Sequence, residues 1–456
     1  MVFSSEIFIF IFLPVVLLLY YLIKPARNII LLIASLFFYA WGEPVYVLLM
    51  LISIACNFLF GVLLENSDDN IKRRLLLVLC VIVNLGLLGY FKYAGFIVDN
   101  LNRISINLSK PNVSLPIGIS FYTFQAMSYV IDVYRRQVPA QKNVLKLGLY
   151  ISMFPQLIAG PIVRYVTIAE EIDSRKVSLQ DFYEGAKRFM FGFAKKILIA
   201  DTVCKIADKA FAMDNPSMNM AWMGAIAYTI QIYFDFSGYS DMAIGLGRMF
   251  GFHFLENFDY PYISKNIREF WRRWHMSLGQ WFRDYVYIPL GGSRCKETRV
   301  CVNYIIVFFL TGLWHGASWN FVVWGLWYAL FILLERILGK KNVFKIPDVI
   351  SHIYSLLVII TGWVFFRAET CSYAINYIKS MFSFKFDHSV WINVTFEQVV
   401  ILLIGLIISM PIYKLIDGKC KEKTPVITDA LALFVFTLGV LYMVGNGFSP
   451  FLYFRF

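Results

Sequence analysis

The sequence predicts an all-α polytopic membrane protein, and three observations lead to this fold class. Of its 456 residues, 59% are hydrophobic and 16% are charged, whereas soluble chains average about 45–50% apolar and about 25% charged residues. Apolar runs that approach the roughly 20 residues needed to cross a bilayer recur from end to end. No separable hydrophilic stretch interrupts them, so residues 1–456 are expected to form a single integral membrane domain.

Ten stretches are apolar enough to be transmembrane helices, and we expect about 11 in all. The ten are residues 7–23, 29–42, 45–64, 75–91, 221–236, 300–314, 319–338, 353–366, 399–413 and 428–445. The first stretch lacks a basic start and a small-residue cleavage site, so we interpret it as a span and not as a signal peptide.

Two further apolar stretches contain residues that interrupt helices. Residues 115–131 include Pro116 and Gly118, and residues 147–163 include Pro155. Irregular backbone is tolerated at membrane depth where it is buried in protein or lines a cavity. We therefore expect short or re-entrant helices around a central funnel.

Lysine and arginine set the expected orientation. The net charge of +12 is concentrated in loops at residues 24–27, 72–74, 268–299 and 414–423, which the positive-inside rule places in the cytoplasm. Both the N-terminus and the tail at residues 446–456 are then outside the cytoplasmic membrane. Lys92, Arg103 and Lys110 fall on the outer side and are exceptions to the positive-inside rule.

Contact with anionic membrane lipid accounts for the excess of basic residues. No nucleic-acid motif is present, so nucleic acid is not an expected partner.

His315 is the strongest catalytic candidate. It lies in an apolar run within the sequence Trp-His-Gly-Ala-Ser-Trp-Asn at residues 314–320, where small and hydrogen-bonding residues suit a lined cavity. An ionisable group at membrane depth is a functional candidate because hydrocarbon does not solvate it. A neutral imidazole can act as a general base. The alternative is a buried histidine that serves packing alone.

His275 is the second candidate, in the basic and aromatic sequence Glu-Phe-Trp-Arg-Arg-Trp-His at residues 269–275. It is either an interfacial histidine in an aromatic belt or a second histidine of the cavity. Two histidines without carboxylate or cysteine partners at ligand spacing do not predict a metal site.

Several long motifs resemble the membrane-bound O-acyltransferase family over nearly the whole chain. The resemblance is closest to the bacterial branch that contains the alginate O-acetyltransferase membrane subunit and the D-alanyl transferase of lipoteichoic acid. The motifs are SLPIGISF at 114–121, QLIAGP at 156–161, YFDFSGYSD at 233–241, NFDYPY at 257–262, EFWRRWH at 269–275, WFRDYVYIPLGG at 281–292 and WHG at 314–316.

The resemblance implies a ring of helices around the funnel, a catalytic role for His315 and a functional role for His275. It also implies acetyl-coenzyme A as the acyl donor, with no permanently bound cofactor. Arginines could hold the donor's phosphates, because guanidinium groups match phosphate oxygens. The candidates are Arg268, Arg272, Arg273 and Arg283. The alternative for this cluster is ordinary positive-inside charge.

Other polar residues are expected to line the funnel. They are Asp235, Ser237, Asp241, Ser318 and Asn320. Ser318, Asn320 or backbone amides near Gly316 could donate hydrogen bonds to a developing oxyanion. The alternative for the two aspartates and Ser237 is a structural, hydrogen-bonded lining.

The tail ends in Phe-Leu-Tyr-Phe-Arg-Phe at residues 451–456. It resembles the terminal motif of a small partner peptide in the D-alanyl transfer system, in which a terminal tyrosine is proposed to carry the acyl group. We therefore expect Tyr453 to relay the acyl group, with an aromatic interface anchor as the alternative.

Together these observations predict a membrane O-acyltransferase that passes acetyl across the membrane for O-acetylation of an exported or cell-wall polysaccharide. No G-x-S-x-G motif is present, so a separate extracytoplasmic acetyltransferase of the serine esterase-like (SGNH) type is an expected partner. Two alternatives stay open. One is D-alanyl transfer to teichoic acid from a carrier protein, and the other is a non-catalytic transporter or flippase.

Overall fold

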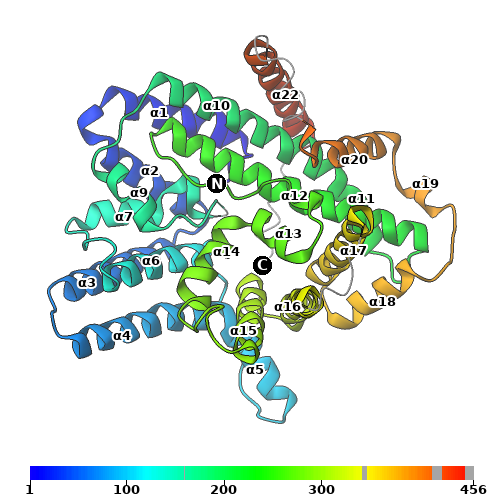
Figure 1. The fold of residues 1–456 in the computed structure, drawn as a ribbon. Helices are drawn as coiled ribbons and strands as arrows, with labels where there is room; N and C mark the ends of the chain where they lie inside the picture. The colour runs from blue at the N-terminus through cyan, green and yellow to red at the C-terminus, as the bar shows by residue number, and fades with distance from the viewer. Residues whose placement is uncertain (159, 341–346, 413–423, 447–456) are drawn as a thin grey trace. The chain divides into compact units, whose positions relative to one another are not determined.

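The computed structural model describes residues 1–158, 160–340, 347–412 and 424–446, and every regular element among these residues is a helix (Figure 1). The described chain forms two compact units. The first comprises residues 1–189 and 240–255, and the second comprises residues 190–239 with the described part of 256–446. Helix α12 (Met218–Met249) contributes residues to both units.

The first unit is built from nine α-helices that precede α10, the part of α10 up to residue 189, and the part of α12 from residue 240. The bounds are α1 (Leu13–Leu22), α2 (Arg27–Gly42), α3 (Tyr46–Glu65), α4 (Asn70–Leu88), α5 (Ala94–Arg103), α6 (Ile119–Tyr134), α7 (Val144–Ser152), α8 (Phe154–Leu157), α9 (Tyr165–Asp173) and α10 (Leu179–Ala194). π-helical turns at Phe8–Phe12 and Gly89–Tyr93 lead into α1 and α5.

The second unit contains the remaining helices and both candidate histidines. Their bounds are α11 (Asp201–Phe211), α13 (Ile267–Arg273), α14 (Met276–Phe282), α15 (Glu297–His315), α16 (Trp319–Lys340), α17 (Asp348–Arg367), α18 (Cys371–Met381), α19 (Ser389–Asn393), α20 (Phe396–Ile408) and α22 (Thr424–Asn446). Two π-helical turns, Lys195–Ala200 and Arg283–Tyr287, follow α10 and α14.

Seven helical stretches in the described residues are long and apolar enough to cross a membrane. They are Lys24–Gly42, Tyr46–Glu65, Asn70–Arg103, Glu297–His315, Trp319–Gly339, Asp348–Arg367 and Val426–Gly445. Two shorter apolar helices, Phe8–Leu22 and Phe396–Ile408, coincide with two more predicted spans. The tenth predicted span, 221–236, is part of the 32-residue helix α12. The all-α, multi-pass fold is thus confirmed, and the ring around a central funnel stays a prediction.

The predicted helix interruptions are present in the first unit. Helix α6 begins only after Gly118, whose φ of 76° is a left-handed conformation that favours glycine. A Cβ at this position would also lie 3.0 Å from the carbonyl oxygen of Leu157. In the second stretch, α7 ends at Ser152 and the short helix α8 starts at Phe154 with Pro155 in its first turn. The proline and glycine positions therefore mark real breaks.

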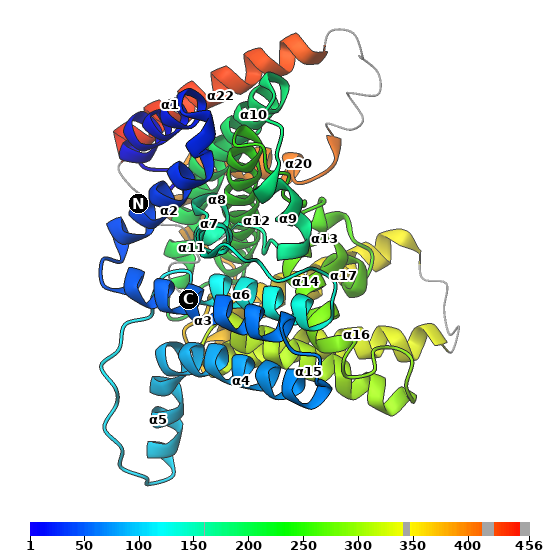
Figure 2. The same cartoon turned by 90° about the vertical axis from the view of Figure 1, so that its left-hand side faces the viewer.

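A buried arginine ties three helix ends of the first unit together. Arg73, at the start of α4, is 5% exposed. Its guanidinium donates to the carbonyl oxygens of Ser67 (3.2 Å) and Tyr134 (2.8 Å), which follow α3 and end α6. Figure 2 shows α3, α4 and α6 as neighbours. One cation thus satisfies carbonyl groups that these helix ends leave without an intrahelical partner.

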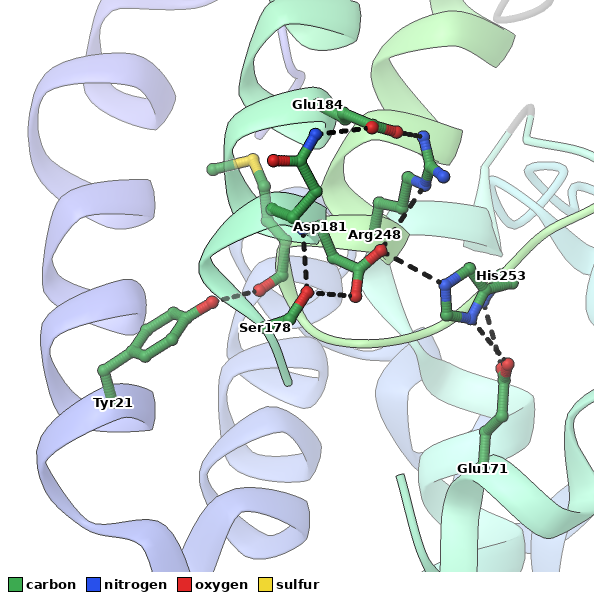
Figure 3. Close-up of polar contacts among 9 residues, drawn as sticks. Tyr21, Glu171, Ser178, Asp181, Glu184, Arg248 and His253 are labelled. Atoms are coloured by element: carbon green, nitrogen blue, oxygen red, sulfur yellow. Dashed lines mark hydrogen bonds and ion pairs between the residues drawn. The ribbon is translucent and has the colours of Figure 1, made fainter. Parts of the chain in front are cut away.

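The C-terminal end of α12 is held in the first unit by a network of charges (Figure 3). Arg248 forms ion pairs with Glu184 and with Asp181, the latter at 3.9 Å. The imidazole of His253 lies between two carboxylates, with Nδ1 2.8 Å from Glu171 and Nε2 3.5 Å from Asp181. These contacts join the end of α12 and the segment that follows it to α9 and to the first two turns of α10.

Glycines allow α15 and α16 to pack closely in the second unit. A Cβ on Gly312 would lie 2.3 Å from the carbonyl oxygen of Phe321, and one on Gly325 would lie 2.2 Å from that of Phe308. Small residues at helix contacts let backbones approach in membrane proteins. This close contact fixes the turn between α15 and α16, where His315 lies.

We predict that Gly325→Ala destabilises the protein, because the added methyl group meets backbone and not a flexible side chain. Overpacking of this kind costs about 1–3 kcal/mol. Gly86→Ala is the matched control, since a Cβ there meets nothing within 4 Å. Thermal unfolding of the detergent-purified proteins should show a lower Tm for Gly325→Ala alone. Equal Tm values for the two variants would contradict the close packing of α15 on α16.

Candidate active site

His315 is the last residue of α15, and its side chain is enclosed by aromatic rings. It is 3% exposed. Its ring centroid lies 5.0 Å from that of Trp314, 4.9 Å from Trp324 and 5.2 Å from Phe366. These residues come from α15, α16 and α17, so three helices hold the imidazole in place. His315 is thus buried, which agrees both with a catalytic histidine in a lined cavity and with a histidine that serves packing alone.

The turn after His315 is fixed by side-chain hydrogen bonds. Ser318 donates to the Oδ1 of Asn320, and the Nδ2 of Asn320 donates to the carbonyl oxygen of Ala368 at 2.8 Å. Asn320 thereby ties the start of α16 to the end of α17. Because these side-chain donors already bind protein oxygens, both residues position the turn, and backbone amides are left as the better candidates for oxyanion donors.

His275 occupies a tight turn between α13 and α14. Its φ of 43° and ψ of 53° are left-handed, which is uncommon for a residue with a side chain. It is 1% exposed, and its Nε2 atom has no hydrogen-bond partner among the described residues. Burial lowers the pKa of His275, which lies outside the candidate spans, to about 3. The imidazole is therefore neutral at physiological pH.

The indole ring of Trp314 lies near both histidine rings. Its indole centroid lies 6.0 Å from the ring of His275 and 5.0 Å from the ring of His315. On another side, Phe236 of α12 meets the His275 ring edge to face at 4.6 Å. Two histidines that are 40 positions apart in the sequence thus share one aromatic neighbour. The two candidates belong to one region of the second unit.

The four predicted phosphate-binding arginines differ in their surroundings. Arg273 forms ion pairs with Asp259 (2.7 Å) and Glu269 (3.1 Å). Arg283 is paired with Asp284 at 2.7 Å. Two of the four are therefore neutralised within the protein.

The other two arginines lie one turn apart on α13. Arg272 is exposed and makes no ion pair within the described part of the chain. Arg268 has a buried Nε without a hydrogen-bond partner in the same residues. Positions i and i+4 of a helix face the same side. Arg268 and Arg272 therefore face one side of α13, and Arg272 is the better placed of the two to bind an anion, because the charge of Arg268 also interacts with the carboxylate of Glu335.

Asp235 is part of a buried ion cluster that the sequence analysis missed. Its carboxylate lies 2.7 Å from the Nζ of Lys196, which also contacts Asp201 at 2.5 Å. The side chains of Lys196 and Asp235 are both 3% exposed. Lys196 lies on the π-helical turn at Lys195–Ala200, and such turns often mark functional sites. One feature of the sequence could have indicated a buried lysine: two lysines stand directly before the apolar sequence Ile-Leu-Ile-Ala at residues 197–200.

The remaining members of the predicted polar patch fall in different places. Ser237 belongs to the second unit, and its buried Oγ has no hydrogen-bond partner among the described residues. Asp241 belongs to the first unit, where its carboxylate lies 2.8 Å from Arg188 of α10. Both aspartates are thus engaged in ion pairs. Tyr453 and the tail beyond Asn446 lie outside the described residues.

Comparison with known proteins gives the family. Residues 132–341 match the model of the membrane-bound O-acyltransferase family. The chain is 42% identical to the probable alginate O-acetylase of Pseudomonas putida, over 100% of both chains. It is 36% identical to the peptidoglycan O-acetyltransferase of Helicobacter pylori, over 84% of this chain and 80% of the relative. A teichoic acid D-alanyltransferase of Bacillus subtilis is 29% identical over 55% of this chain and 70% of its own length. The chain therefore belongs to the membrane-bound O-acyltransferase family and is a multi-pass membrane enzyme that transfers acyl groups to oxygen.

Proposed function

We propose that the enzyme takes an acetyl group from acetyl-coenzyme A on the cytoplasmic side and passes it through the membrane for O-acetylation of an exported or cell-wall polysaccharide. Its likeness to an alginate O-acetylase extends over the full chain, whereas its likeness to a D-alanyltransferase extends over about half of it. Acetyl transfer is therefore better supported than D-alanyl transfer. A serine esterase-like extracytoplasmic transferase is the proposed partner.

One observation carries the chemical part of the proposal: two buried histidines share Trp314 as an aromatic neighbour. In the proposed reaction, the neutral imidazole of His315 removes the proton of the acceptor hydroxyl. The hydroxyl oxygen then bonds to the thioester carbonyl carbon, the carbon–sulfur bond breaks, and the imidazolium returns its proton to the coenzyme A thiolate. General base catalysis of this kind contributes about 10²–10⁴-fold in rate.

We predict that His315→Ala lowers the rate of coenzyme A release from acetyl-coenzyme A by about 10²–10⁴-fold, because the general base is lost. His388→Ala, which changes an exposed histidine, is the matched control and should retain the wild-type rate. The measurement uses purified protein and a thiol reagent that reports free coenzyme A. A fully active His315→Ala enzyme would contradict the assignment of the base.

We propose that Arg268 and Arg272 bind the phosphates of the acyl donor. Charged hydrogen bonds contribute about 1.5–3 kcal/mol, so Arg272→Ala should raise KM for acetyl-coenzyme A about tenfold or more with little change in kcat. Arg283→Ala should have a much smaller effect, because Arg283 is already paired with Asp284.

Acetyl-pantetheine, which lacks the nucleotide phosphates, gives a second check on Arg272. With this donor, the wild type and Arg272→Ala should have the same KM. A KM difference that persists with acetyl-pantetheine would show that Arg272 does not act on the phosphates.

We also propose that Tyr453 carries the acetyl group as a phenyl ester between donor and final acceptor. A phenol with a pKa near 10 needs a base to react at neutral pH, and His315 is the proposed base. Tyr453→Phe should abolish transfer of acetyl label to the C-terminal peptide, measured by mass spectrometry, and should abolish extracellular product. Its thermal unfolding should match that of the wild type. Normal acetylated product from this variant would refute the relay.

A further inference from the structure

The side chain of Asn257 lies beside His275, and its hydrogen bonds indicate its role. The Oδ1 atom of Asn257 lies 3.2 Å from the Nδ1 of His275. The same oxygen accepts hydrogen bonds from the backbone N–H of Ser277 (3.2 Å) and from its hydroxyl (2.9 Å). Asn257 is 1% exposed and belongs to the motif at residues 257–262.

These contacts determine which atoms carry hydrogen. A backbone N–H is always a donor, so the atom of Asn257 that faces Ser277 must be the carbonyl oxygen and not the amide nitrogen. That oxygen can only accept, and therefore the Nδ1 of His275 must carry the proton. In a neutral imidazole the other nitrogen, Nε2, then holds a free lone pair.

The backbone supports the same arrangement. The carbonyl oxygen of Asn257 accepts from the N–H of Met276 at 2.9 Å, and the N–H of Asp259 donates to the carbonyl oxygen of Arg273 at 3.0 Å. The segment that carries Asn257 thus runs along both sides of the left-handed turn at His275. A left-handed residue with a side chain is strained and persists where its surroundings fix it.

The lone pair on Nε2 is buried and has no partner among the described residues. Leaving a buried acceptor unsatisfied is unfavourable. The rings packed on the imidazole, Phe236 and Trp314, carry no charge, and no hydrogen bond joins the indole N–H of Trp314 to Nε2. A substrate that brings an O–H or N–H group to this position would satisfy it.

We propose that Asn257 is a positioning residue that holds His275 in the Nδ1–H tautomer, so that Nε2 accepts a hydrogen bond from a donor group of the bound substrate. This inference rests on the proposed acetyl transfer for the substrate's identity. The tautomer itself follows from the geometry and can be tested without turnover.

The tautomer is measured by ¹⁵N NMR of protein labelled at histidine, with the His275 signals assigned by their loss in His275→Gln. We expect a protonated Nδ1 and an unprotonated Nε2 in the wild type at neutral pH. In Asn257→Leu, which keeps a similar volume but removes the acceptor, we expect an Nε2–H signal to appear. A wild-type His275 with its proton on Nε2 would overturn the proposal, whether or not the protein releases coenzyme A.

Kinetics test whether the tautomer matters for transfer. Asn257→Leu should lower kcat for coenzyme A release about 100-fold or more, as expected for an imidazole freed from its orienting partner. In the His275→Gln background the same substitution should cause little further loss. An equal loss in both backgrounds would show that Asn257 acts on folding and not through His275.

Asn257→Asp keeps an oxygen that accepts the hydrogen bond, and this variant provides the test if Asn257→Leu does not fold. Its carboxylate favours the imidazolium and raises the pKa of His275. The acid limb of the kcat profile should therefore move to higher pH than in the wild type, and activity should recover as pH rises. An unchanged profile in a folded Asn257→Asp enzyme would also overturn the proposal. Failure of the wild type to release coenzyme A would instead count against the proposed function.

Discussion

A charged group that is buried away from water is costly unless it is paired within the protein, and this constraint organises both units of the enzyme. An unpaired buried charge costs several kcal/mol. Lys196 accordingly contacts both Asp235 and Asp201, and Arg73 satisfies carbonyl groups at the ends of two other helices. Each such contact fixes the position of one helix against another, which nondirectional apolar packing alone does not do.

The candidate site depends on this constraint as well as on packing. Asn320 holds the turn that follows His315, and Asn257 holds the turn that contains His275. Glycines bring α15 against α16, and aromatic rings enclose both imidazoles. Burial keeps His275 neutral. The protein thus encloses two imidazoles beside Trp314, and the imidazole of His275 is uncharged. In the proposed reaction the imidazole of His315 serves as the general base.

The transmembrane helices and the helix breaks could be predicted because hydropathy, proline and glycine are local properties of the sequence. Lys196 could not be paired with Asp235, because they are 39 positions apart in the sequence and no local pattern links a lysine to a distant carboxylate. The arginines could not be distinguished from the sequence for the same reason. Arg272 and Arg273 are equivalent candidates in the sequence, whereas in the structure Arg273 forms an ion pair with Asp259 and Arg272 is exposed. Asn257 was visible within a motif, but its role depends on three hydrogen bonds to one oxygen.

The central claim is that acetyl crosses the membrane through this enzyme with the help of His315. Sealed vesicles with their cytoplasmic face outward test it most directly. Labelled acetyl-coenzyme A is added outside, and ester-linked label is measured inside for the wild type and for His315→Ala. The account predicts accumulation of label in wild-type vesicles and almost none with His315→Ala. Equal accumulation in both, or label confined to the outer face of wild-type vesicles, would contradict it.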